Sequence, residues 1–262
     1  MKSHALLFLS LLFLPSLAFA QKGIIESFTP ANPIVVDGVP DEWQTEWLIE
    51  PKGKFIYNVC NDADNLYVRI KVSDDMTQRK IGLFGLSVLL NPKGKKYGKV
   101  GVKYPLPKDL DQLVKDAPQG QVSPQQVAEL KKELIKDVEV LELVGLSKEN
   151  IVSPRLGLMN GLQVFIKADD RGDFVYEAKI PFKAFHIDKS AVKVLGVAFV
   201  TGKLVVKAQN SQSNAPAGGY QNQGYIATGY NRRYMNSGGG YSSTPYSTWQ
   251  SSTSMSVGVT LK

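Results

Sequence analysis

Short apolar runs that alternate with polar residues recur along most of the chain and restrict what it folds into. A two-residue period, combined with β-branched and aromatic residues, is typical of half-buried strands. Glycine, asparagine, aspartate and proline separate the runs and favour turns. We expect strands at 34–36, 55–60, 66–72, 83–90, 99–104, 138–144, 162–167, 174–180, 192–200 and 256–261. Because no helices alternate with these strands, the pattern predicts an all-β fold, an antiparallel β-sandwich.

One segment between two of these strands is predicted to be helical instead. Ser123 suits an N-cap, Pro124 the first helical position and Gln126 the third residue of a capping box. Apolar residues follow at helical spacing, namely Val127, Leu130, Leu134 and Val138. A shorter helix is expected at 108–116. Both belong to an excursion at about 105–137, which we interpret as a small helical insertion on one edge of the sandwich.

Residues 209–254 differ from the rest of the chain in composition. They are rich in asparagine, glutamine, serine, glycine and tyrosine and contain almost no aliphatic residues. Such a segment buries too little apolar surface to offset the entropy lost on ordering, so we expect a low-complexity loop inserted before the last strand. A flexible linker and a segment for weak, multivalent contacts are both compatible with this composition.

Residues 1–20 have the layout of a cleavable export signal. A positively charged start and an apolar run precede the small residues Ala18 and Ala20, and we expect cleavage after Ala20. The mature part, 21–262, is expected to be a single domain that is secreted or periplasmic. No apolar stretch has the length of a transmembrane helix, and Gln21 rather than a cysteine follows the cut, which argues against a lipid anchor.

The charges are distributed unevenly, with a formal net charge of +7. Every acidic residue lies between Glu26 and Asp188, whereas 189–262 contains basic residues and no acid. The basic residues there are Lys189, Lys193, Lys203, Lys207, Arg232, Arg233 and Lys262. This acid-free part favours contact with an anionic surface, although a solvated basic tail is the alternative. No motif indicates specific nucleic-acid recognition.

The residues that most enzymes use for catalysis are sparse, and we predict that the protein is not an enzyme. His186 is the only histidine after the signal, Cys60 is the only cysteine, and no nucleophile-elbow or phosphate-loop motif is present. We expect Cys60 to pack in a strand and His186 to lie at the surface. Adjacent acids such as Asp74 and Asp75 would point to opposite faces of a strand, which does not suit glycoside hydrolysis.

We expect no cofactor, with a structural calcium ion as a possible exception that the acidic residues suggest. Asp62 and Asp64 lie in an expected turn, and Asp74 and Asp75 follow the next expected strand. Carboxylate oxygens near turns are the ligands that calcium prefers. We therefore consider these four residues as candidate metal ligands.

Four segments, in order, resemble family 9 carbohydrate-binding modules and their relatives. The first, 35–43, reads Val-Val-Asp-Gly-Val-Pro-Asp-Glu-Trp, like the opening motif of that family. The others are 61–74, 174–182 and 195–199. The resemblance implies a jelly-roll-like β-sandwich, and we assign Trp43 to its core.

Sugar-binding members of this family hold the sugar between two aromatic faces. By resemblance, one face would come from the region 81–84, which contains Phe84 and no tryptophan, and the other from Trp249, just before the last strand. Pyranose C–H groups pack on such rings, so Trp249, Tyr246 and Phe84 are the candidate ligand-binding residues. Anchoring of the preceding loop to the sandwich is the alternative role of Trp249.

We therefore expect an exported, non-catalytic carbohydrate-binding-like module that binds a glycan or another cell-surface partner. The alternative is a structural, assembly or adhesion protein of the cell envelope that makes its contacts through residues 209–254.

Overall fold

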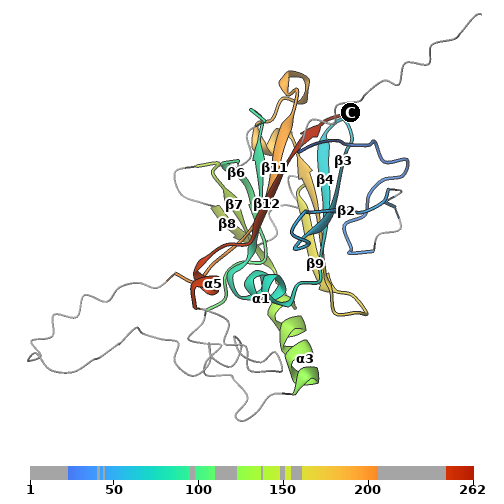
Figure 1. Ribbon diagram of the computed structural model, residues 1–262. Coiled ribbons are helices and arrows are strands. Elements are labelled where there is room, and N and C mark those ends of the chain that lie inside the picture. Colours follow the sequence, from blue (N-terminus) through green and yellow to red (C-terminus); the bar gives the residue numbers. More distant parts are fainter. Residues whose placement is uncertain are drawn as a thin grey trace, which may run out of the picture.

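The computed structural model describes residues 23–39, 42–43, 45–94, 98–109, 123–136, 138–147, 151–154, 161–205 and 246–262, without the side chains of 124, 151–154 and 246. Two β-sheets face each other (Figure 1). The larger has the order β1 (Ile24–Glu26), β12 (Ser254–Thr260), β11 (Leu195–Thr201), β5 (Leu86–Asn91), β6 (Val100–Lys103), β7 (Val140–Val144) and β8 (Ile151–Pro154). The smaller has the order β2 (Leu48–Ile49), β3 (Ile56–Asn61), β4 (Asn65–Val72), β10 (Phe174–Pro181) and β9 (Gln163–Ala168).

The predicted all-β sandwich is confirmed, and its core lies between the two sheets. Alternate residues of β5, namely Leu86, Val88 and Leu90, are buried there. Phe199 of β11 crosses the interface, because its ring centroid lies 6.1 Å from that of Phe55 and 5.7 Å from that of Tyr57. The sheets are not purely antiparallel, since β1 pairs with β12 in parallel.

The N-terminal segment covers the outer face of the smaller sheet. The expected strand at 34–36 is not formed, and this part of the chain instead lies against β4 and β10. The guanidinium carbon of Arg69 lies 4.9 Å from the ring centroid of Trp43 and 3.9 Å from that of Trp47. Trp43 is buried, as predicted. Glu177, beside Arg69 in the register, accepts a 2.8 Å hydrogen bond from the backbone N–H of Gly38. The Asp-Gly and Trp parts of the opening motif therefore hold this layer on the sheet.

A helix, α1 (Asp75–Phe84), lies where the sequence predicts the start of a strand. Asp74 caps its first turn, and the helix ends at Gly85, which has φ of 85°. A Cβ atom at Gly85 would lie 2.4 Å from the carbonyl oxygen of Pro105, so only glycine fits. The expected strand at 83–90 is wrong in its first residues, because β5 begins after this turn. The apolar residues at the end of α1 and in β5 form one continuous run, and periodicity alone does not separate such a helix end from a strand.

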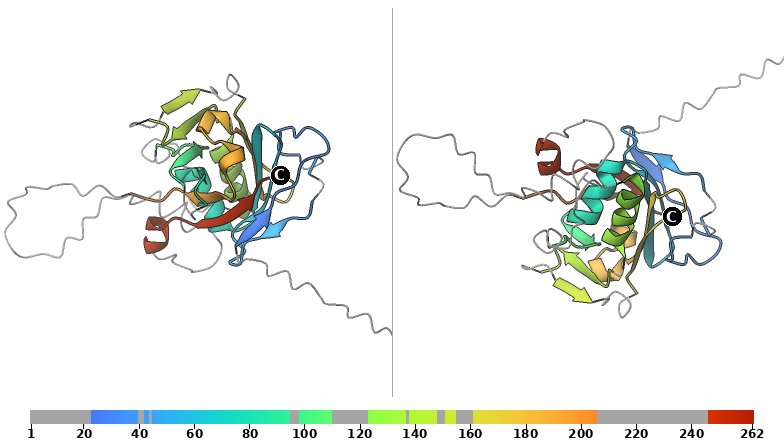
Figure 2. Two further views of the ribbon diagram at one scale, coloured as in Figure 1. Left: turned by 90° about the horizontal axis from the view of Figure 1, so that it is seen from above. Right: turned by 90° about the horizontal axis from the view of Figure 1, so that it is seen from below.

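The predicted helical insertion is confirmed in α3 (Pro124–Ile135), including the capping box between Ser123 and Gln126. Figure 2 shows α1 and α3 side by side at one end of the sandwich. A Cβ atom at Gly82 would lie 2.8 Å from Cβ of Leu134, so the glycine permits this close approach. The shorter helix expected at 108–116 lies outside the described residues except for 108 and 109, which are not helical. Among the described helices, none is long and apolar enough to cross a membrane.

Candidate functional site

Trp249 and Phe84, two of the three predicted sugar-binding residues, meet at the helical end of the sandwich. Their ring centroids are 6.3 Å apart in an edge-to-face arrangement. Trp249 is only 1% exposed, and it packs with Phe84 in a small apolar cluster that also contains Leu83, Leu134 and Leu204. A ring buried on this scale has no free face for a pyranose. The prediction of Trp249 and Phe84 as sugar-stacking residues is therefore corrected, because both rings are used in packing.

The role of Trp249 is to close the base of the long insertion. The backbone N–H of Leu204 donates a 2.8 Å hydrogen bond to the carbonyl oxygen of Trp249, so the chain leaves and returns at adjacent points. Trp249 belongs to a short helix, α5 (Tyr246–Gln250), and β12 begins four residues after it ends. The low-complexity loop predicted at 209–254 thus ends earlier than expected. The side chain of Tyr246, the third predicted sugar-binding residue, and residues 206–245 lie outside the described part.

Substitution of Trp249 separates packing from sugar contact. We expect Trp249→Ala to lower the free energy of unfolding by about 3–5 kcal/mol, because it leaves a large cavity among apolar side chains. Chemical denaturation measures this change. The control is Gln250→Ala, an exposed neighbour on α5, for which the change should stay within about 0.5 kcal/mol. Unchanged stability in Trp249→Ala would contradict the packing role.

The four predicted calcium ligands do not come together. Asp62 and Asp64 precede β4, whereas Asp74 and Asp75 follow it, and its eight residues span about 26 Å. Asp62 accepts hydrogen bonds from the backbone N–H groups of Asp64 and Asn65, and Asp75 pairs with Arg79 at 2.7 Å. Throughout the described residues, no group of three or more acidic, histidine or cysteine side chains is placed to hold a metal ion. The calcium hypothesis for these four residues is therefore not supported.

Cys60 and His186 lie where the sequence predicts them, one in a strand and the other at the surface. Cys60 is fully buried in β3, and burial raises the pKa of its thiol to about 12, against the smaller opposing effect of Arg69. His186 is exposed at the end of a short 3₁₀ turn, Lys183–Phe185. A thiol with so high a pKa is not a nucleophile at neutral pH.

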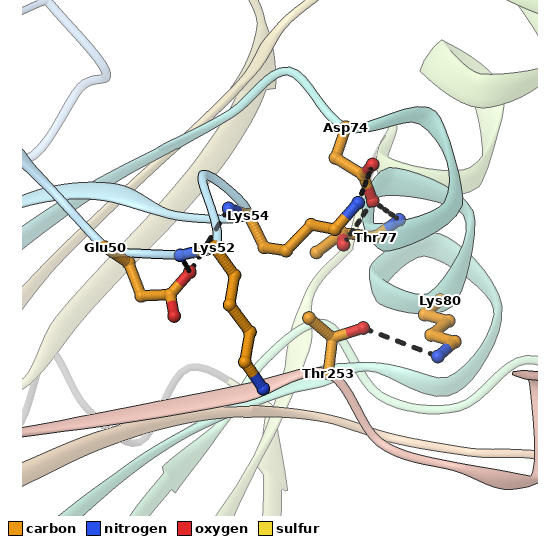
Figure 3. A network of polar contacts seen from close by, with 7 residues as sticks. All are labelled: Glu50, Lys52, Lys54, Asp74, Thr77, Lys80 and Thr253. Atoms are coloured by element: carbon orange, nitrogen blue, oxygen red, sulfur yellow. Dashed lines mark hydrogen bonds and ion pairs between the residues drawn. The ribbon is translucent and has the colours of Figure 1, made fainter.

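A cluster of polar side chains at the helical end of the sandwich is the best candidate site (Figure 3). We define the lysine cluster as Glu50, Lys52, Lys54, Asp74, Thr77, Lys80 and Thr253. Its members come from three separate parts of the chain: the turn between β2 and β3, the first turns of α1, and the residue before β12. It contains three ammonium groups and two carboxylates.

The turn that carries Lys52 and Lys54 is held in place by Glu50. The carboxylate of Glu50 accepts hydrogen bonds from the backbone N–H of Lys52 at 3.0 Å and of Lys54 at 3.3 Å. The N–H of Gly53 donates to the carbonyl oxygen of Glu50 at 2.7 Å, and Gly53 has the positive φ of 67° that such a tight turn favours in glycine. The two lysine side chains are therefore presented from a defined backbone.

Asp74 joins this turn to α1. Its Oδ2 accepts hydrogen bonds from the backbone N–H of Thr77 at 2.9 Å and from the Thr77 hydroxyl at 2.6 Å, and its Oδ1 accepts from Nζ of Lys54. Burial alone would raise the pKa of Asp74, but the hydrogen bonds from Lys54 and Thr77 outweigh it and hold the pKa below its ordinary value. Asp74 therefore stays ionised and serves as an acceptor, not as a general acid.

Lys80 connects α1 to the segment before β12. Only 3% of the residue is exposed, and its Nζ donates to the carbonyl oxygen of Ser251 at 2.8 Å and to Oγ1 of Thr253 at 3.4 Å. Within the described residues, Lys80 forms no ion pair. Burial lowers the pKa of Lys80 below its ordinary value, partly opposed by the negative charge of Asp74. A cation without a carboxylate partner gives the site an excess of positive charge.

Part of the lysine cluster remains accessible, namely Lys52, Lys54 and Asp74, whereas Lys80 and Thr77 are buried. The Lys54 side chain is 41% exposed and that of Asp74 is 23% exposed, although the two are paired. Lys52 forms no ion pair in the described part of the chain. Such a surface suits a ligand that carries hydroxyl groups and negative charge, because ammonium groups donate to its anions and the carboxylate accepts from its hydroxyls.

Sequence reasoning identified Asp74 but not the lysines around it. Lys52, Lys54 and Lys80 have no spacing motif, because their approach depends on the β2–β3 turn and on α1, which the sequence did not reveal. The one available signal was Thr77 three residues after Asp74, an N-cap pattern that predicts the start of a helix.

Acid titration tests the network around Asp74. Because the folded-state pKa of Asp74 lies below its unfolded value, its ionised form stabilises the fold above about pH 4, and this contribution disappears as the pH falls through the lower, folded-state pKa. Asp74→Asn keeps a capping side chain but loses the charge. We expect the Asp74→Asn variant to be less stable than the wild type at neutral pH. In acid, the difference in the free energy of unfolding between the two proteins should become small. Asp170→Asn, in an exposed turn, is the control. A stability difference that does not depend on pH would contradict this assignment.

No protein-family model and no curated protein matches the chain. Among solved structures, the chain is similar to a family 9 carbohydrate-binding module from Caldicellulosiruptor kristjanssonii, determined in complex with glucose. The similarity covers 68% of this chain and 77% of that module, with 13% identity and a TM-score of 0.32. A match this distant carries no argument about the ligand.

Proposed function

We propose that this protein is an exported, non-catalytic β-sandwich module that binds an acidic glycan at the lysine cluster. The single observation that carries the proposal is that Lys52, Lys54 and Lys80 lie at one end of the sandwich in a cluster that contains two carboxylates, Glu50 and Asp74. The layout of residues 1–20 as an export signal supports the compartment, where glycans of the cell surface are available.

The chemistry of the cluster favours an acidic over a neutral sugar. A neutral pyranose gains much of its binding free energy from an exposed aromatic face, and Trp249 is buried. Uronate or sulfate groups instead pair with exposed ammonium groups, and their attraction weakens as salt screens the charges. We therefore expect modest affinity that falls steeply with ionic strength.

The acid-free C-terminal part adds less positive charge near the lysine cluster than its composition suggests. Among its described basic residues, Lys262 pairs with Glu26, and Lys189 donates to the carbonyl oxygen of Asp62. Lys193 and Lys203 flank β11 at opposite ends of the strand. Of these four described residues, Lys203 is the one toward the lysine cluster, since the backbone N–H of Thr201, two residues before it, donates to the carbonyl oxygen of Thr253.

The carboxyl groups support a role without catalysis. A glycosidase of the usual kind needs an accessible carboxylic acid with a raised pKa. Among the described residues, Glu177 is the carboxyl group whose pKa is raised, chiefly by burial, and it is 0% exposed beneath the N-terminal segment.

Binding to a panel of polysaccharides tests the proposal. We expect retention on polygalacturonate or heparin, loss of retention at high salt, and little retention on cellulose. The double variant Lys52→Ala, Lys54→Ala should bind the acidic polymers several-fold more weakly, because each lost charge contact costs up to about 1 kcal/mol. Lys93→Ala, an exposed lysine in the turn at the opposite end of β5, is the matched control. Equal binding by both variants, or no binding to any acidic polymer, would contradict the proposal.

A role in envelope assembly through the Tyr-rich insertion is the second candidate. The hydrogen bond between Leu204 and Trp249 supports it, because the insertion leaves the sandwich from a single closed base. Replacing 206–245 by a short glycine linker distinguishes the two functions. The glycan proposal predicts that the shortened protein still binds acidic polymers, whereas the assembly role predicts that self-association or surface retention is lost.

A further inference from the structure

A groove of about 690 Å³ runs along β9, away from the lysine cluster. All six residues of β9, Gln163–Ala168, line it, together with Leu162. Successive side chains of a strand point to opposite faces, so a pocket under one face would be lined by alternate residues only. A groove that contacts every residue in turn therefore follows the edge of the strand, where its backbone is accessible.

The edge of β9 is free within the described part of the chain. Among the described strands, β9 ends the smaller sheet and pairs only with β10. In an antiparallel pair, alternate residues direct their N–H and C=O groups away from the neighbouring strand. The outer edge of β9 thus presents a row of donors and acceptors that another strand can satisfy.

Apolar side chains flank this edge on both faces of the strand. On one side lie Val35 and Val36 of the N-terminal layer, and Val35 is 50% exposed. On the other side lie Tyr104, Ile135 and Leu141, which belong to the core between the sheets. The groove is therefore a slot beside a strand edge with apolar walls, and an added strand with alternating apolar residues would fill it.

The charges at the groove favour an acidic occupant. Among the described residues that line it, Lys132, Lys136 and Lys167 face one acid, Glu139. Lys132 pairs with Glu129, and Lys136 pairs with Glu133, but exposed ion pairs of this kind contribute little free energy. Lys167 forms no ion pair with the described residues. A second copy of β9 would bring the same lysines together, so like-charge repulsion disfavours that occupant.

We propose that an extended acidic peptide segment of another protein adds to the smaller sheet along the free edge of β9. Main-chain hydrogen bonds to β9 supply the pairing, the apolar walls take apolar side chains, and the lysines beside the groove attract its acids. This interaction surface is separate from the lysine cluster and does not depend on glycan binding.

Two isomeric peptides test the proposal. The probe is a capped, fluorescent peptide of alternating valine and glutamate as long as β9, with backbone N-methyl groups on either the valines or the glutamates. In an extended peptide, the N–H groups of the valines point to one edge and those of the glutamates to the other. The isomer whose methyl groups replace the N–H hydrogens that face β9 should therefore bind to the full chain at least about tenfold more weakly than the other isomer. Fluorescence anisotropy measures both, and hydrogen exchange should show protection of 163–168 by the tighter isomer.

Charge variants provide the second arm. Lys132→Ala and Lys136→Ala should weaken the tighter isomer about two- to fivefold each, whereas Lys93→Ala should not. Equal affinity of the two isomers, or no binding of either, would overturn the proposal. Protection of 163–168 that rises with protein concentration and without peptide would also overturn it, because it would identify a second copy as the occupant.

Discussion

The carboxylate of Asp74 is the contact on which the proposed site depends. It caps α1 through Thr77 and holds Lys54 of the β2–β3 turn, so one side chain connects the end of β4 to two neighbouring segments. Once α1 starts there, Lys80 lies one turn further on and reaches the residues before β12. The three parts of the site therefore form together, and its ionised acceptor and its excess of cations have a common origin.

The burial of Trp249 decides what kind of ligand the module suits. The resemblance to family 9 carbohydrate-binding modules implied an aromatic clamp, but in this chain the ring fills an apolar cluster between α1, α3 and α5. It stabilises the base of the insertion instead of presenting a face. The recognition surface left at this end is charged and polar, which favours an acidic ligand over a neutral sugar ring.

The sandwich was predictable from the sequence because the strands β4, β10 and β12 have clear two-residue periods and because turn residues separate the expected strands. The capping box of α3 was equally readable, since Ser123, Pro124 and Gln126 lie within four consecutive residues. The lysine cluster was not predictable from the sequence, because Lys52, Lys80 and Thr253 are brought near one another only by the tertiary structure. Helix α1 was missed because its last apolar residues continue into β5, where tertiary packing decides between helix and strand.

The central claim is that the lysine cluster binds an acidic glycan, and a titration followed by NMR tests it most directly. An isotope-labelled protein would be titrated with a short oligogalacturonate at low salt. The account predicts saturable shifts at the backbone amides of Lys52, Lys54, Thr77 and Thr253, with those around Lys93 unchanged. Shifts that are absent at these amides, or that spread over the surface without saturation, would contradict it.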